Sequence, residues 1–187
     1  MKRPDVPEHA EKVFSGVLFD VYQWDQELYD GSTARFEKAL RNDSVLVLAV
    51  AGEDVVVTRE QHPGGAPFYS LVCGFLEDDE KPLVTAKREL REEAGLEASS
   101  WELYKSFSYG SKVDWTGHLF LAKGCKEVGE QQLDAGEKVD VFRVSFDEFL
   151  ELTLREDFRN KEVALELARM RLRDGEIEEF KKRLFSS

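Results

Sequence analysis

The sequence predicts a mixed α/β fold in which a β-sheet sandwich surrounds one helix, with a small β subdomain before it and helices after it. Three observations support this expectation. Short apolar segments such as Ser44 to Val50 and Gly117 to Ala122 are typical of buried strands. Residues 82–94 carry apolar side chains at helical spacing, and that spacing returns after Phe146. Strands and helices in this order pack in layers around a shared core.

The composition fits a single globular unit and excludes several classes of protein. The chain has 187 residues, 42% of them hydrophobic, which is enough for a sizeable core. A formal charge of −12 and a pI near 4.8 argue against a long nucleic acid as partner. Because no long apolar run and no signal peptide occur, we expect neither membrane insertion nor secretion. Cys73 and Cys125 show no metal-ligand spacing, which indicates a reducing, cytoplasmic location.

Residues 1–42 are expected to form a polar arm and a β subdomain. The arm, residues 1–11, contains two prolines. The β unit from Val13 to Lys38 alternates polar and apolar residues, and Asp30-Gly31 signals a hairpin turn within it. One strand is expected from Val17 to Tyr22 and its return from Thr33 to Glu37.

The main domain, residues 43–187, is expected to continue with strands and to end in helices. After Ser44 to Val50, the expected strands are Val55 to Thr58, Phe68 to Cys73, Trp101 to Ser108, Gly117 to Ala122 and Lys138 to Val144. Two C-terminal helices follow, separated by a break at Asp174-Gly175. Their apolar positions are Val163, Leu167 and Met170, and then Ile177, Phe180 and Leu184.

The segment from Gly74 to Leu96 combines an acidic loop with an amphipathic helix. Pro82 suits the first helical position, where its missing N–H group costs nothing. Gly95 suits the left-handed residue that ends a helix. The apolar positions are expected to form one buried stripe of Leu83, Ala86, Leu90 and Ala94.

Three glutamates of this helix could together bind a divalent cation. Glu89 is three residues before Glu92 and four before Glu93. Their side chains therefore project from neighbouring positions of the helix. Their mutual repulsion would be relieved by a hard cation such as Mg²⁺, which takes oxygen ligands. Arg88 can pair with a neighbouring carboxylate and hold it in place.

The spacing of the whole segment resembles the Nudix box. It reads Gly, five residues, Glu, seven residues, Arg-Glu-Leu, one residue, Glu-Glu, one residue, Gly. A solvated charge run is the alternative for the glutamates alone, but Gly74, Glu80 and Gly95 at these positions argue against it. The chain is therefore identified as a member of the Nudix hydrolases, and the resemblance implies the Nudix fold around this helix.

The resemblance also implies a metal site. Mg²⁺, with Mn²⁺ as the alternative, would be held by the backbone carbonyl of Cys73 and by the carboxylates of Glu89, Glu92 and Glu93.

Further roles follow from the same resemblance. Glu92 and Arg88 would serve catalysis beside the metal. Glu137, or else Asp134, would come from a loop to orient or deprotonate the attacking water. Residues expected to support the motif itself are Gly74, Glu80 and Gly95.

Outside the box, the chain resembles the nucleoside-diphosphate-sugar and ADP-ribose pyrophosphatases. The features that carry this resemblance are the Tyr-Asp-Gly turn ahead of the core and the acidic segment at 134–137. It implies a small nucleotide substrate and a homodimer formed through the β unit Val13–Lys38. ADP-ribose enzymes often carry Gln-Tyr-Arg where this chain has Gln61-His62-Pro63, and a proline where residues 106–112 have none. GDP-mannose is therefore as consistent with the sequence as ADP-ribose.

Other candidate contacts and other functions stay open. Arg59, Lys112 and Trp115 could touch the substrate, although surface charges and a packed aromatic are the plainer interpretations. A hydrolase of nucleoside triphosphates or dinucleoside polyphosphates is the alternative within the family. A non-catalytic ligand-sensing module is disfavoured because none of the box glutamates is missing.

Overall fold

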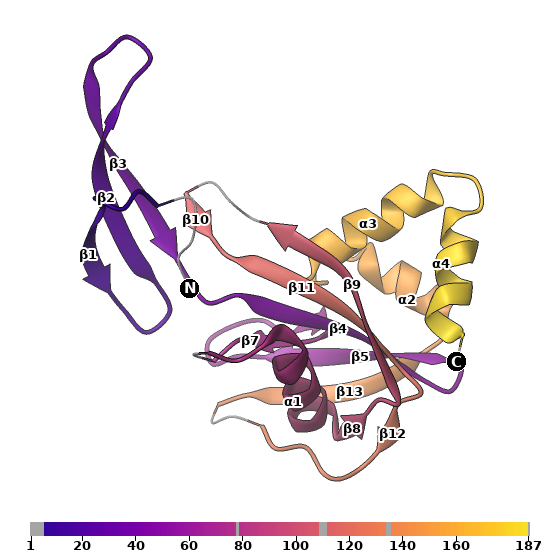
Figure 1. Cartoon of the computed structure of the whole chain (residues 1–187). Helices are drawn as coiled ribbons and strands as arrows, with labels where there is room; N and C mark the ends of the chain where they lie inside the picture. The colour runs from indigo at the N-terminus through magenta and orange to yellow at the C-terminus, as the bar shows by residue number, and fades with distance from the viewer. Residues whose placement is uncertain (1–5, 78, 109–111, 134–135, 187) are drawn as a thin grey trace.

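The structure is a computed structural model that describes residues 6–77, 79–108, 112–133 and 136–186 (Figure 1). Its strands are β1 Glu11–Ser15, β2 Asp20–Glu27, β3 Thr33–Leu40, β4 Ser44–Ala51, β5 Asp54–Gln61, β6 Phe68–Ser70, β7 Val72–Phe75, β8 Leu96–Glu97, β9 Ser100–Ser108, β10 Val113–Asp114, β11 Thr116–Lys123, β12 Lys126–Glu127 and β13 Lys138–Val144. Its helices are α1 Pro82–Ala94, α2 Phe146–Thr153, α3 Lys161–Arg171 and α4 Glu176–Phe185.

The main sheet has the strand order β13-β5-β4-β11-β9, with β6 added to β5 and β7 added to β4. Strands β4 and β11 are parallel, and the other neighbours are antiparallel. Figure 1 shows α1 on one side of this sheet and the C-terminal helices on the other. The expected α/β sandwich around one helix is confirmed.

Strand β4 shows why the sheet is covered on both faces. Leu46 and Leu48 belong to the apolar cluster under the C-terminal helices, whereas Val45 and Val47 belong to the cluster under α1. Successive side chains of a strand point to opposite faces, so a continuous apolar run can only be buried by two layers. The result is a helix, sheet and helix arrangement that holds α1 firmly against β7.

The N-terminal strands β1 to β3 form, together with β10 from the middle of the chain, a separate sheet of order β1-β2-β3-β10 that projects away from the main sheet (Figure 1). The hairpin turn at Asp30-Gly31 is confirmed, with Gly31 at φ 80°. The strand expected from Val17 to Tyr22 is wrong in its first three residues, because β2 begins at Asp20. The N–H of Gly16 bonds to the carbonyl of Phe19 at 2.9 Å, so residues 16–19 form a turn between β1 and β2 with Val17 fully exposed.

The two expected C-terminal helices correspond to α3 and α4, and a separate helix that was not delimited from the sequence, α2, precedes them. Helix α2 begins with a capping box in which Ser145 and Glu148 bond each other's backbone N–H groups. Val163 and Leu167 of α3 and Phe180 and Leu184 of α4 are buried against the sheet. Within the described ranges, no helix is both long and apolar enough to cross a membrane.

Candidate active site

Helix α1 begins and ends where its sequence predicts. Pro82 occupies the first turn, and Gly95 ends the helix in the left-handed conformation at φ 64°, donating its N–H group to the carbonyl of Arg91 at 2.9 Å. A side chain at Gly95 would also collide with the carbonyl of Gly129. Glycine is thus required here on two counts.

The buried face of α1 differs from the expected apolar stripe. Ala86 and Leu90 are fully buried, but Leu83 is 38% exposed, so its assignment to the stripe is wrong. Glu89 and Glu93 are buried instead, at 9% and 7% exposure. The helix packs on β7, and the side of the helix that faces this strand carries carboxylates.

The two buried glutamates meet the backbone at Cys73 and Gly74. Glu93 accepts a hydrogen bond from the N–H of Cys73 at 3.2 Å. A Cβ atom at Gly74 would collide with the carboxylate of Glu89, so that carboxylate lies directly on the glycine backbone. Cys73 is half-buried at the surface of the site, and desolvation raises the pKa of its thiol, which disfavours a nucleophilic thiolate.

Arg88 connects the remaining carboxylates of the motif. Its Nη1 atom lies 2.8 Å from Glu89 and 2.9 Å from Glu92, and its Nη2 atom lies 3.1 Å from Glu80. Glu80 also accepts from the Thr85 hydroxyl at 2.8 Å. The hydrogen bond from Arg88 holds the pKa of Glu80 below its usual range. Arg88 and Glu80 therefore fix the rotamers of the two carboxylates that share Nη1.

Burial makes the charged forms of the two inward-facing glutamates unfavourable. It raises the pKa of Glu89 to about 7 despite the opposing effect of Arg88. Burial also raises the pKa of Glu93 to about 9, with further contributions from Glu60 and Glu89. Buried charges are unfavourable unless they are paired or coordinate a metal.

The donor set suits a hard divalent cation. Carboxylate oxygens of Glu89 and Glu93 meet the backbone at Cys73 and Gly74, and carboxylate and carbonyl oxygens are ligands that Mg²⁺ prefers. Among the described residues, no three acidic, histidine or cysteine side chains stand close enough together to hold a metal ion as they are. Two of the carboxylates, those of Glu89 and Glu92, are instead bound to Nη1 of Arg88.

These groups line a cavity of about 610 Å³. Of the residues singled out from the sequence, it brings together Cys73, Gly74, Arg88, Glu89, Glu92, Glu93, Trp115 and Glu137. Arg59 and Lys112 lie elsewhere. Arg59 is exposed on β5 between two inward-facing residues, and Lys112 packs over the Phe36 ring of the N-terminal sheet at 4.7 Å. Asp134 lies outside the described residues.

Several lining residues were missed by sequence reasoning. Glu60 alternates with exposed Arg59 on β5, so the period of two could have shown that it points inward. Arg41 precedes β4 and lies over the rings of Phe75 and Trp115 at 4.1 and 4.7 Å. Arg159 comes from the segment before α3 and carries no local signal of its position.

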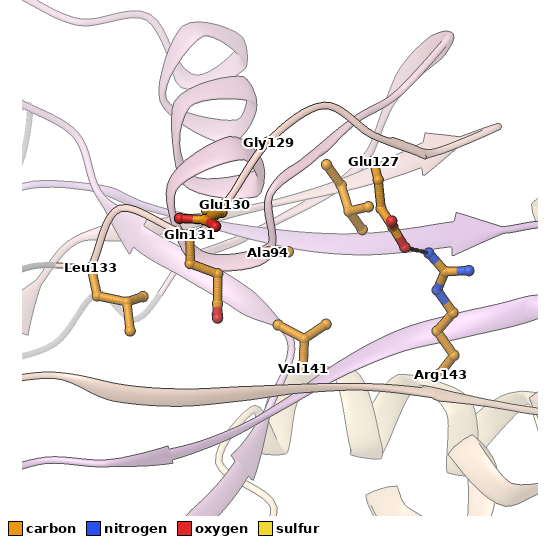
Figure 2. Close-up of a pocket in the computed structure, with 9 residues that line it drawn as sticks. Ala94, Glu127, Gly129, Glu130, Gln131, Leu133, Val141 and Arg143 are labelled. Atoms are coloured by element: carbon orange, nitrogen blue, oxygen red, sulfur yellow. Dashed lines mark hydrogen bonds and ion pairs between the residues drawn. The ribbon is translucent and has the colours of Figure 1, made fainter.

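A second hollow of about 720 Å³ lies beside the C-terminal end of α1 (Figure 2). Figure 2 shows the ion pair of Glu127 and Arg143, 2.7 Å long, at one end and Gln131 with Leu133 at the other. The side chain of Gln131 donates to the carbonyls of Glu93 and Val139. This hollow lacks the box carboxylates, but its wall fastens the end of the glutamate helix to β13.

Comparisons with known proteins place this chain in a family. The model of the NUDIX domain matches residues 40–167. The ADP-ribose pyrophosphatase of Bacillus subtilis (strain 168) is 31% identical over 170 residues, which is 88% of this chain and 91% of the relative. The methanol dehydrogenase activator of Bacillus methanolicus is 35% identical over 146 residues, 76% of this chain and 79% of the relative.

The fold has a counterpart among solved structures. The crystal structure of an ADP compounds hydrolase superposes with a TM-score of 0.73 at 22% identity, over 92% of this chain and 97% of that one. It shows the same fold. With the family model matching most of the chain and carboxylates of the motif gathered at Cys73 and Gly74, the chain belongs to the Nudix family.

Proposed function

We propose that this chain, a Nudix pyrophosphohydrolase, cleaves the pyrophosphate bond of a nucleoside diphosphate sugar such as ADP-ribose or GDP-mannose. The products are a nucleoside monophosphate and a sugar phosphate. The observation that carries the proposal is that Glu89 and Glu93 meet the Cys73–Gly74 backbone in a cavity that Glu92 also lines. The ADP-ribose pyrophosphatases among its relatives support the class of substrate.

The metal in this proposal is Mg²⁺, or Mn²⁺ in its place. The Cys73 carbonyl and the carboxylates of Glu89, Glu92 and Glu93 would hold it, since these oxygens fit its ligand preference. When bound, the cation supplies positive charge that stabilises the diphosphate as it reacts. For Glu89 and Glu92 to turn toward a cation, Arg88 must release at least one of them, and its third partner Glu80 keeps it nearby.

Glu137 is proposed to accept the proton of the attacking water. It lies half-buried on the cavity wall, and its charge is felt by both Glu89 and Glu93, whose pKa values it helps to raise. A carboxylate in reach of the reacting water acts as a general base.

The nucleobase is proposed to lie at the aromatic end of the cavity. Arg41 lies over Phe75 and Trp115 there, which provides flat surfaces of the kind on which a base stacks. In this proposal Trp115 contacts the substrate, as was suggested from the sequence.

We also propose a homodimer formed through the N-terminal sheet. Phe14, Val17 and Leu18 are exposed on this projecting sheet, with Phe14 at 57%. An exposed apolar edge of this kind is usually covered by another chain.

One experiment tests the substrate class. The protein is incubated with a panel of sugar nucleotides, ADP-ribose, nucleoside triphosphates and dinucleoside polyphosphates, and the products are identified by mass. We expect cleavage between the two phosphorus atoms of several diphospho-sugars. If triphosphates are cleaved at least tenfold more efficiently than every diphospho-sugar, the proposed substrate class is wrong.

A further inference from the structure

In the segment 157–160, just before α3, Arg159 and Asn160 line the cavity although they are far along the chain from the box. The N–H of Tyr69 donates to this segment and the N–H of Arg159 donates back to the Tyr69 carbonyl, both at 2.8 Å. The buried side chain of Asn160 accepts from the N–H of Leu71 at 2.8 Å. The segment is therefore fixed beside the strands that lead to the glutamates.

The side chain of Arg159 is supported by two rings. It lies over Phe68 at 4.8 Å, and His62 stacks on the same ring at 5.4 Å. Arg159 donates to Nε2 of His62 at 3.2 Å. Because a guanidinium has no acceptor, Nε2 must accept, and the ring proton is on Nδ1. The nearest Glu60 oxygen is 4.0 Å from Nε2, beyond hydrogen-bond distance.

The cavity that Arg159 lines is acidic, whereas a diphosphate substrate needs positive charge. The carboxylates on its wall are Glu60, Glu77, Glu89, Glu92, Glu93, Glu137 and Glu162. Of its described arginines, Arg88 is already bound to carboxylates of the motif. Arg41 and Arg159 bring guanidinium groups from outside the box. Each of these guanidinium groups can bind an anionic part of the substrate, which the glutamates alone would repel.

These two arginines lie toward opposite ends of the segment 68–75. Arg159 covers Phe68 at its start, and Arg41 covers Phe75 at its end. The Cys73 and Gly74 backbone, with the buried glutamates, lies between. A molecule made of two organic halves joined by a diphosphate matches this order. At the Arg41 end the cavity is lined by the large rings of Phe75 and Trp115, whereas at the Arg159 end Phe68 lies behind the guanidinium and does not line the cavity.

We propose that Arg159, oriented by His62 and Phe68, binds the phosphate oxygens of the sugar-phosphate half of the substrate and so determines specificity for diphospho-sugars. The proposal rests on the proposed function. A guanidinium fork held flat on a ring suits an oxyanion, because less side-chain freedom is lost when it binds. Lysine at this position would keep the charge but lose the fork.

The experiment compares Arg159→Met and Arg159→Lys with Arg155→Met. Arg155 is the matched control, since it lies on a neighbouring turn, covers the Tyr69 ring at 5.1 Å and pairs with Asp157 at 2.7 Å, but does not line the cavity. For ADP-ribose, KM, kcat and the inhibition constants of the two products, ribose 5-phosphate and AMP, are measured with Mg²⁺ present.

We expect Arg159→Met to raise KM and the inhibition constant of ribose 5-phosphate by about tenfold or more, as for loss of a charge-assisted hydrogen bond. The AMP constant should change less than about twofold, Arg159→Lys should fall between, and Arg155→Met should match the wild type. An unchanged constant for ribose 5-phosphate, or an equal rise for both products, overturns the proposal. If the wild type cleaves only triphosphates, the proposed function is wrong. The inhibition constants of ribose 5-phosphate and AMP, measured against triphosphate hydrolysis, then still test whether Arg159 binds the sugar phosphate.

Discussion

Replacing Glu93 by glutamine should stabilise the metal-free protein as the pH rises, although it lowers the metal-dependent activity. In the metal-free protein, burial raises the pKa of this carboxyl to about 9, against an ordinary value of 4.5. The folded state therefore binds a proton more tightly than the unfolded state between these two values. The stability that the Glu93 proton contributes is fully present below the pKa of the unfolded state. It is lost as the pH rises from that value toward the pKa of the folded state.

The magnitude follows from that pKa difference. One shifted group contributes about 1.4 kcal/mol per pH unit, so between pH 6 and pH 8 Glu93 should cost the wild type about 3 kcal/mol of unfolding free energy. Glutamine keeps the shape, stays neutral and can still accept from the Cys73 N–H. In chelator, Glu93→Gln should therefore gain stability relative to wild type as pH rises.

The assay is urea unfolding at pH 6 and pH 8 in chelator, and again with saturating Mg²⁺. Metal ligands must be deprotonated, so Mg²⁺ should stabilise the wild type more at pH 8 than at pH 6 and stabilise the variant little. The exposed Glu178→Gln serves as control. A difference between wild type and Glu93→Gln that does not change with pH in chelator would refute the reasoning.

Three further changes test other parts of the site. Gly74→Ala places a methyl group against the Glu89 carboxylate, so kcat should fall by about a hundredfold or more, and a rate near the parent's contradicts the close approach. Glu137→Gln should lower kcat with little change in KM, because a base acts in the transition state, and a rise in KM alone would point to binding instead. Phe14→Asp should convert the proposed dimer to a monomer in light scattering at micromolar concentration, whereas a wild type that is already monomeric removes the dimer.

Much of the fold could be predicted because local signals were strong. Pro82 and Gly95 mark the ends of α1 by backbone rules that tertiary contacts did not override. The apolar run of β4 showed a strand buried on both faces. The turn at residues 16–19 was missed because Val17 and Phe19 have strand propensity, and its hydrogen bond is only visible in three dimensions. The two-residue strands β8, β10 and β12 are too short to leave a pattern.

The candidate site, like the fold, could be predicted from the sequence only in part. The box glutamates are close in sequence on one helix, so their shared face could be predicted. The apolar stripe failed at Leu83, since the helix turns Glu89 and Glu93 toward β7 and leaves Leu83 at the surface. Arg159 reaches the cavity through pairing of residues 157–160 with β6, a long-range contact that no local pattern encodes.

Turnover of the best diphospho-sugar after complete removal of divalent metal tests the central claim most directly. The account predicts that hydrolysis falls to the uncatalysed background and returns in a saturable way when Mg²⁺ is added, with Glu93→Gln recovering only a small fraction. An unchanged rate after complete chelation would contradict a cation held by Glu89, Glu92 and Glu93.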